Sequence, residues 1–443
     1  MSTSEAPSRS AWRAFGPGLL FAGAAVGVSH LVQATRAGAS FGLAALLVIA
    51  FACAVKFPAF RAGPHYAAAT GRSLLEAYRH QGRWTLVAFA ALTLMTMFTV
   101  TAAVTLVTAG IAVPVLGLAP LLAGTVGAAH GPLALSALLL VIAAALLASG
   151  GYAWLDRFIK IVVPVLTLAT LVATCLALGR IQWSWAALLP DTRVVTGAGL
   201  AFTVALIGWM PSAIDTSIWS SLWTVARARQ QHANIDMRAA LLDFDAGYTL
   251  TLLLALAFAL LGTGLMYGQG IDFANGPAAF ATQVIDLYVA TLGAWSRPFI
   301  GLIALLVMLS TVVTVVDGFP RVIAALVAQL GLAFVPGRGA GPADAAEGDR
   351  RVYRVTFGVL TGGALAILAW GMGSFTALID LATTLSFLTA PVLAFFNHRA
   401  LRAPEVPHAL RPGTAMTAWS ALAVVLQAAF AAWYLWFTFG RAS

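Results

Sequence analysis

The sequence predicts an all-α integral membrane protein with about eleven transmembrane helices. Of its 443 residues, 60% are hydrophobic and only 9% are charged, whereas a soluble protein carries about 25% charged residues. A soluble globule of this composition would expose a largely apolar surface to water, which argues against a soluble enzyme, a nucleic-acid-binding protein or a disordered scaffold. The two cysteines lie in apolar runs, so neither a disulfide framework nor a thiolate metal site is indicated.

Apolar runs of about 20 residues recur along the chain and are long enough for helices that cross a bilayer. They are too uniformly apolar for barrel strands, whose side chains alternate between lipid and lumen. No polar linker is long enough to fold as a separate soluble domain, so we expect residues 1–443 to form one transmembrane domain. The predicted spans lie near 16–35, 41–60, 85–112, 130–149, 157–178, 197–224, 240–266, 295–320, 354–370, 374–397 and 415–438.

The basic residues predict how these helices are oriented. If the N-terminus lies in the cytoplasm and the spans alternate, 19 of the 25 basic residues fall on the cytoplasmic side and 4 on the other side. An excess of Lys and Arg in cytoplasmic loops is the usual pattern for membrane helices. We therefore expect a cytoplasmic N-terminus, an extracytoplasmic C-terminus and a location in the plasma membrane, in a pattern that fits a bacterial inner membrane.

Two spans are interrupted by glycine, proline and polar residues, whereas most of the others are continuous runs of Leu, Ala and Val. The first span carries Gly16-Pro17-Gly18 and then the segment 27–30, and the sixth carries Met210-Pro211-Ser212 and then Asp215. Proline inside a helix removes a backbone donor. An unwound stretch survives in a membrane only where it lines protein or a water-filled cavity. Both spans are therefore predicted to be broken helices.

Breaks in spans one and six predict two repeats of five helices. In carriers with inverted repeats, paired breaks in the two halves indicate the transport site. We place repeat one at about 12–180, repeat two at about 195–398 and one extra helix at about 415–438. Proline and glycine are common in membrane helices in general, and Pro164 and Pro391 also lie in predicted spans, so an ordinary packing origin of the breaks stays open.

Several motifs resemble those of the NRAMP family of divalent-metal transporters, over nearly the whole chain. The first span resembles the family's opening helix in its length and its glycines, and residues 69–74 resemble the turn after the second helix. Met210-Pro211 resembles the family's Met-Pro-His motif, and Asn234-Ile235-Asp236 resembles the entry to helix seven. The resemblance implies the broken-helix, inverted-repeat fold that the family shares with many sodium-coupled amino-acid carriers.

The positions that bind metal in the family have changed in this sequence. The family's Asp-Pro-Gly-Asn motif supplies an aspartate and an asparagine to the metal, and an ungapped alignment places Gly-Val-Ser-His of residues 27–30 there. Helix six keeps the family's methionine as Met210, but the two histidines of that helix fall at Ser212 and Ser217. The family's third helix carries acidic residues, whereas the segment 85–112 has none.

A small anion is the favoured substrate, for example bicarbonate or a short carboxylate. The missing carboxylate at Gly27 would have repelled an anion, and half-helix N-termini at the breaks offer N–H groups and a favourable dipole. Hydroxyl groups and an imidazole add hydrogen-bond donors. Asp215 is a candidate to bind a Na⁺ or H⁺ that accompanies the anion. The predicted substrate site comprises Gly27, Ser29, His30, Met210, Ser212, Asp215 and Thr216.

Three further residues are candidates for binding a coupling ion or for gating. Trp209 lies beside the break of the sixth span, and ordinary packing between helices is its alternative role. Asp317 and Asp380 are carboxylates within spans, and such groups are functional candidates unless they pair with a cation such as Lys56 or Arg36.

Other ionisable groups near span ends are expected to be solvated. Asp243 and Asp245 open the seventh span near the cytoplasm, where they would cap the helix or face water. The histidines outside the first span are expected at the membrane interface: these are His65, His80, His130, His232, His398 and His408.

A transporter of a divalent cation, Mg²⁺ or Mn²⁺, is the alternative function, with His30 and Met210 as the metal ligands. A hydrated ion could bind through its waters and tolerate few direct ligands, but a dehydrated one needs anionic or strong oxygen ligands within a membrane. An enzyme is not expected, because no nucleophile–base or metalloprotease motif occurs. We expect no cofactor beyond a coupling Na⁺ or H⁺. The expected partners are the small ion and the lipid bilayer, with neither nucleic acid nor a protein partner.

Overall fold

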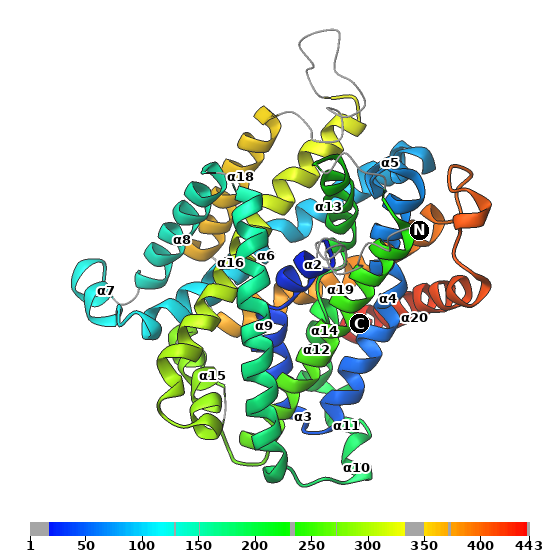
Figure 1. Cartoon of the computed structure of the whole chain (residues 1–443). Coiled ribbons are helices and arrows are strands. Elements are labelled where there is room, and N and C mark those ends of the chain that lie inside the picture. Colours follow the sequence, from blue (N-terminus) through cyan, green and yellow to red (C-terminus); the bar gives the residue numbers. More distant parts are fainter. Residues whose placement is uncertain are drawn as a thin grey trace, which may run out of the picture.

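The computed structural model describes residues 17–127, 130–149, 151–230, 235–271, 273–332, 350–370 and 374–440, and within these ranges all regular secondary structure is helical (Figure 1). Nine of the described helices are long and apolar enough to cross a membrane. They are α4 (Ala44–Thr70), α6 (Arg83–Val115), α8 (Gly131–Ala148), α9 (Gly151–Ala177), α14 (Met237–Leu265), α16 (Ser296–Gln329), α18 (Arg350–Trp370), α19 (Phe375–Ala400) and α20 (Thr414–Phe439).

Two further segments, 17–41 and 197–230, are broken into shorter helices and lie at the places of the predicted first and sixth spans. The protein is therefore an integral membrane protein, and the predicted all-α fold with broken first and sixth spans is confirmed. The outer bounds differ from the prediction, because α6 has 33 residues and α16 has 34. Both are longer than the roughly 20 residues that a bilayer requires.

The first span is broken between Ala25 and Ser29. It consists of α2 (Pro17–Ala25), a π-helical turn η1 (Ser29–Ala34) and α3 (Thr35–Phe41). Pro17 is the first described residue of the span, and the break lies further along, after Ala25. At the break the Ser29 hydroxyl donates to the Ala25 carbonyl over 2.6 Å, so a side chain satisfies a backbone group that the end of the helix leaves free.

The sixth span is broken between α12 (Gly197–Trp209) and α13 (Thr216–Gln230). Pro211 lies in the middle of the break and follows a cis peptide bond. Gly208 lies in the last turn of α12, where a Cβ atom would stand 1.9 Å from the Thr383 carbonyl oxygen of α19. A glycine is therefore needed where α12 and α19 come into backbone contact.

One apolar helix of the structure was not predicted. It is α15 (Pro277–Leu292), which packs on α6 and α16. It has 16 residues, fewer than a membrane span requires, and it includes Asp286. It therefore does not stand out in the sequence as a long apolar run. The amphipathic helix α5 (Leu74–Gln81) also lay outside the predicted spans. The side chains of Ser73 and Glu76 form a capping box at its start.

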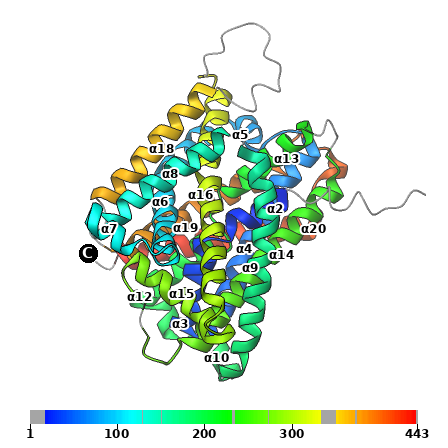
Figure 2. The same cartoon turned by 60° about the vertical axis from the view of Figure 1, so that its left-hand side comes forward.

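The broken first span lies at the centre of the bundle. Its parts α2, η1 and α3 all pack on α14, and α2 also contacts α9, α13 and α16 (Figure 1). By contrast, α18 and α20 bury only 17% of their most apolar windows. The turned view shows α8 and α18 side by side at the edge of the bundle, where they also contact one another (Figure 2). Lipid-facing helices thus surround an inner group that holds both breaks.

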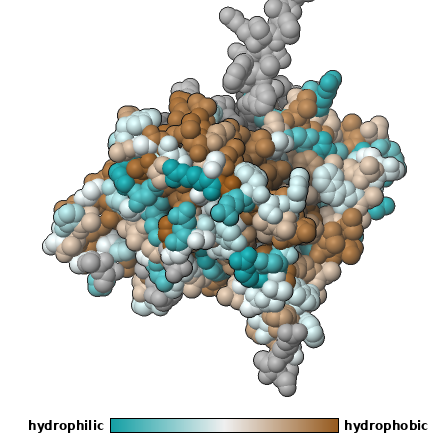
Figure 3. All heavy atoms as spheres, turned by 90° about the horizontal axis from the view of Figure 1, so that it is seen from below, coloured by the Kyte–Doolittle hydropathy of each residue, from teal (hydrophilic) through white to brown (hydrophobic). Residues whose placement is uncertain are grey.

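A large open hollow lies at the end of the molecule that carries the short helices α10 (Trp185–Leu188) and α11 (Thr192–Val195). Its volume is about 960 Å³, and its lining includes Arg180, Asp191 and Arg193. In the view of this end, hydrophilic residues gather over the middle of the face and hydrophobic ones lie toward its edges (Figure 3). This end therefore has the polarity of a surface in contact with water.

The expectation that Asp243 faces water is wrong. Its side chain is buried, and its carboxylate accepts the Gly18 N–H of α2 over 2.8 Å. Asp245 is partly exposed and pairs with Arg61 at 2.8 Å. The interfacial role expected of His65 is wrong as well, because the residue is buried in α4 and its Nε2 donates to the Leu410 carbonyl over 2.7 Å. The sequence does not show that neighbouring elements cover these positions.

Replacing Asp243 by Ala should lower the free energy of unfolding by about 1–3 kcal/mol, because a buried backbone N–H would lose its acceptor. Thermal unfolding of the detergent-solubilised protein measures this loss. Asp286→Ala is the matched control, since the Asp286–Arg297 ion pair is about half exposed on both sides and should contribute little. An equal effect of the two substitutions would contradict a structural role for Asp243.

Candidate functional site

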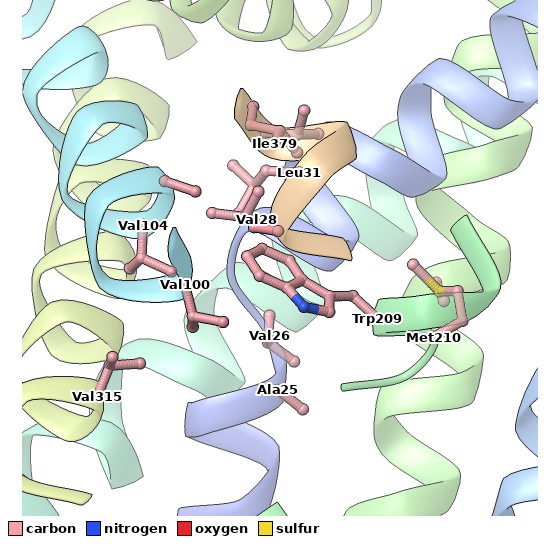
Figure 4. Packing of buried hydrophobic residues seen from close by; sticks show 14 of the residues in the cluster. Ala25, Val26, Val28, Leu31, Val100, Val104, Trp209, Met210, Val315 and Ile379 are labelled. Carbon is pink, nitrogen blue, oxygen red and sulfur yellow. The ribbon is translucent and has the colours of Figure 1, made fainter. Parts of the chain in front are cut away.

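A small cavity lies where the two broken spans meet. It offers about 40 Å³ and is bounded by α2 and the first break, by α6, by the second break with α13, and by α16. Most of its wall is apolar and includes Val28, Val100, Val104, Val315 and Phe319. Figure 4 shows Val100 and Val104 on α6 and Val315 on α16, all on the same side of the first break.

Five of the predicted residues line this cavity together. Four of them are polar, and they come from both breaks: Ser29 from the first, and Ser212, Asp215 and Thr216 from the second. The fifth is Trp209, whose indole N–H donates to the Ser386 hydroxyl of α19 over 2.9 Å. The structure thus brings together side chains that lie about 180 residues apart in the sequence.

The other three residues of the predicted substrate site do not line the cavity. Gly27 lies in the first break, and a Cβ atom there would stand 2.9 Å from the Thr311 hydroxyl of α16. His30 points toward α14, where its Nε2 donates to the Thr251 carbonyl over 2.9 Å. Met210 is fully buried and lies on the far side of Trp209 from Val100 and Val104 (Figure 4).

Among the described residues that line the cavity, Asp215 is the one with a carboxylate. Its side chain is 4% exposed, and it accepts a long hydrogen bond of 3.4 Å from the Thr96 hydroxyl of α6. A buried carboxylate in a membrane helix is costly unless it is paired or protonated. Asp215 therefore has the environment of a group that can gain or lose a proton, or bind a cation, when the contents of the cavity change.

The two carboxylates proposed for coupling or gating lie elsewhere. Asp317 accepts two hydrogen bonds from Arg321, at 2.8 and 3.1 Å, and one from the Tyr353 hydroxyl at 2.7 Å. Asp380 forms a two-pronged ion pair with Arg36, at 2.8 and 3.2 Å. For Asp380 this is the pairing that the sequence left open, whereas the partner of Asp317 is an arginine one turn away on α16.

The sequence analysis named Lys56 only as a possible partner of a carboxylate and missed that it reaches the second break from α4. Its side chain is 1% exposed, and its Nζ donates to the carbonyls of Gly208 at 2.7 Å and Ser212 at 3.3 Å. The available signal was a single lysine inside an apolar run of α4. A basic residue so far from either end of an apolar span is a functional candidate on that ground alone.

Trp219 was also missed, although it is a tryptophan inside a span rather than near its end. It lines the cavity from α13 and packs edge-on against Phe319 at 5.0 Å between ring centroids. Its indole nitrogen is buried, yet it has no hydrogen-bond partner among the described residues. An unsatisfied buried donor is costly, and this one belongs to a residue of the cavity lining.

The residues at the breaks do not form a set of metal ligands. The described ranges contain no group of three or more His, Cys, Asp or Glu side chains able to hold a metal ion. The predicted ligands His30 and Met210 point away from the cavity, which leaves Asp215 with hydroxyl groups and backbone carbonyls. A dehydrated divalent cation prefers six or more oxygen ligands with several carboxylates among them.

No protein-family model matches the sequence. The uncharacterized protein PM0681 of Pasteurella multocida (strain Pm70) is 32% identical over 394 residues, which cover 88% of this chain and 84% of that protein. Among solved structures, a mutant of the Eremococcus coleocola manganese transporter is similar with a TM-score of 0.65 at 15% identity, over 97% of this chain and 88% of that chain. Mhp1, a nucleobase-cation-symport-1 family transporter, is similar with a TM-score of 0.54 at 16% identity, over 99% of this chain and 96% of that chain.

At 15–16% identity these similarities establish the fold. The similarity to these structures therefore also confirms the predicted broken-helix architecture. The boundaries of the two repeats stay a prediction. The similarity to the Pasteurella protein is of another kind, because it extends over most of both sequences at 32% identity. The chain belongs to the same family as the uncharacterized protein PM0681 of Pasteurella multocida, and its fold is that of the manganese transporter and Mhp1.

Proposed function

We propose that the protein is a secondary active transporter that carries a small anion, such as bicarbonate or a short carboxylate, by alternating access. Both structural neighbours are membrane transporters rather than enzymes, which supports transport as the function. The cavity between the two helix breaks lies where carriers of inverted-repeat fold bind their substrates. The basic residues favour a cytoplasmic N-terminus in a bacterial inner membrane.

The observation that carries the anion proposal is that Trp219, one of the residues lining the mostly apolar cavity, has a buried indole N–H with no hydrogen-bond partner among the described residues. Ser212 also lines the cavity, whereas the hydroxyls of Ser29 and Thr216, two further lining residues, already donate to the Ala25 and Ala213 carbonyls. The N-terminus of α13 begins there too, and its dipole favours negative charge. A volume of about 40 Å³ equals roughly three water-sized spaces, so the cavity suits a substrate of a few heavy atoms.

We assign Asp215 the role of carrying the proton that accompanies the anion. An ionised carboxylate in the cavity wall would repel an anion, whereas the protonated form would not and could donate a hydrogen bond to it. Binding of the anion and of the proton would then favour each other, since linkage between two sites is reciprocal. A proton gradient could thereby drive accumulation of the anion.

Transport of a divalent cation is the second candidate, and Asp215 is the observation that favours it. The similarity in fold to a manganese transporter adds to it. The proposed anion site is favoured because the cavity offers one carboxylate only and is too small for a cation with its full shell of water.

Uptake into liposomes distinguishes the two substrates. The purified protein is reconstituted, and the entry of ¹⁴C-labelled bicarbonate, ¹⁴C-labelled acetate and Mn²⁺ is compared with and without pH and Na⁺ gradients. We expect saturable uptake of an anion that rises with an inward proton gradient and does not occur in protein-free liposomes. Saturable uptake of Mn²⁺ without any anion flux would overturn the proposal in favour of the second candidate.

Replacing Trp219 by Phe should weaken anion uptake about five- to ten-fold, the cost of one hydrogen bond of about 1 kcal/mol to the substrate. Because this N–H bonds to no described residue, thermal stability should change little. Trp419→Phe is the matched control, since it removes an indole hydrogen bond to the Ala54 carbonyl outside the cavity and should leave uptake unchanged. Unchanged uptake in Trp219→Phe would remove this indole from the substrate site.

A further inference from the structure

The side chain of Lys56 ends at the second helix break, on two carbonyl groups that the break leaves free. The Gly208 carbonyl belongs to the last turn of α12, and the Ser212 carbonyl follows Pro211. The last carbonyls of a helix have no partner within it, and proline supplies no N–H to compensate. The ammonium group therefore binds the backbone oxygens that unwinding exposes.

Desolvation opposes a charged ammonium group at Lys56, and the groups around it offset that cost in part. A buried cation is costly. The C-terminal end of a helix, however, carries partial negative charge, and a carbonyl in the last turn of α12 accepts a hydrogen bond from the Lys56 Nζ. The carboxylate of Asp215 is close enough to interact with Lys56 electrostatically, although no ion pair within 4 Å joins the two among the described residues. Cys53, on the same helix, and Tyr248 of α14, which donates to the Cys53 carbonyl, are the neighbouring titratable groups.

A second small cavity of about 20 Å³ lies beside Lys56, between α4, α12, α19 and α20. Its wall is almost wholly apolar and includes Gln427, whose buried side-chain carbonyl has no hydrogen-bond partner among the described residues. The two backbone carbonyls are therefore the acceptors that the structure gives to Lys56.

We propose that the Lys56 ammonium is a built-in cation, which occupies the carbonyl oxygens at the sixth-span break that a soluble coupling cation would otherwise bind. In carriers with broken helices, unwound carbonyls and helix C-termini bind Na⁺. Here they are already occupied by a group tethered to α4. Transport is therefore independent of Na⁺, and the proton is the coupling ion. The inference deepens the proposed function and rests on it for its transport readout only.

Chemical rescue of a lysine deletion tests this assignment. Lys56→Ala removes the equivalent of one propylammonium ion and leaves the two carbonyls without a cation. We expect a fall of at least 5 °C in the unfolding midpoint in detergent and at least a ten-fold loss of uptake. Millimolar propylammonium should restore at least half of each loss, and the uncharged isostere propanol should restore neither. Lys160→Ala, which removes the only other lysine of the chain, should show no rescue by propylammonium.

Two further measurements keep the test decisive. Lys56→Met retains most of the side-chain volume without the charge, and we expect a folded protein with at least ten-fold lower uptake. Wild-type uptake by Lys56→Met, failure of propylammonium to rescue Lys56→Ala, or a specific stabilisation of the wild type by NaCl over choline chloride would each overturn the proposal. If the wild type carries no anion, the proposed function fails, while rescue of the unfolding midpoint still decides the role of Lys56.

Discussion

Asp215→Asn should abolish the accumulation of substrate driven by a pH gradient, with a loss of at least ten-fold, and yet leave exchange of substrate across the membrane largely intact. Asparagine has the shape and the neutral charge of a protonated aspartate, so the cavity can still accept an anion. It cannot release a proton, and binding of the anion is then no longer linked to the gradient. Net uptake and exchange of labelled substrate in the same liposomes measure the two effects separately.

Asp380→Asn is the matched control for Asp215→Asn. Its carboxylate is about one-third exposed and pairs with Arg36 away from the cavity, so its neutralisation should leave the effect of the pH gradient unchanged. Accumulation at the wild-type level in Asp215→Asn would show that another group carries the proton. Loss of exchange together with accumulation would point to a role in binding instead of coupling.

Gly27→Asp should destabilise the protein strongly and should not create a metal transporter, although it restores the carboxylate of the metal-transporter motif. A Cβ atom at this position would stand 2.9 Å from the hydroxyl and 3.0 Å from the methyl group of Thr311. Threonine is branched at Cβ and has few alternative rotamers in a helix. Overpacking of this kind costs about 1–3 kcal/mol, and burial of an unpaired carboxylate adds to that cost.

The contributions of size and charge can be separated by two comparisons. Gly27→Ala adds only the Cβ atom and should lose about 1–3 kcal/mol of stability. The same change at Gly358 of α18, where a Cβ atom meets nothing within 4 Å, should be neutral or slightly stabilising. Adding Thr311→Ala to Gly27→Asp should recover most of the lost unfolding midpoint. Calorimetry should still detect no tight Mn²⁺ binding, because His30 and Met210 point away from the cavity.

Wild-type stability of Gly27→Asp would contradict the packing argument. Tight Mn²⁺ binding by Gly27→Asp combined with Thr311→Ala would show instead that the loss of one carboxylate was enough to change the substrate. The second outcome would favour the divalent cation over the anion as the substrate of this site.

Much of the fold could be predicted from the sequence, because the apolar length of a span and the residues that break it are local signals. The predicted spans and both breaks follow from runs of Leu, Ala and Val and from the neighbourhood of Gly27 and Pro211. The short helix between two spans and the long-range contacts were harder to predict from the sequence. α15 is too short to stand out, and the burial of Asp243 depends on Gly18, which lies 225 residues away in the sequence.

The site was only partly predictable, because a motif gives the residues near a break and not the directions in which they point. Ser29 faces the cavity, whereas the next residue, His30, faces α14. That difference depends on how the chain leaves the break, and here it continues as a π-helical turn, whose residues follow a different angular spacing from those of an α-helix. Lys56 reaches the second break from another span, and no motif links the two.

The hydrogen bonds of the first span limit how it can move. Three hydrogen bonds join it to α14. The Gly18 N–H donates to the Asp243 carboxylate, His30 donates to the Thr251 carbonyl, and the Thr263 hydroxyl donates to the Gly38 carbonyl. To tilt the first span alone would break all three bonds, whereas a motion shared with α14 breaks none of them. The smallest unit that can tilt without breaking these bonds is therefore the first span together with α14. One of the three bonds comes from His30, which stands where the motif that the first span resembles has a metal ligand.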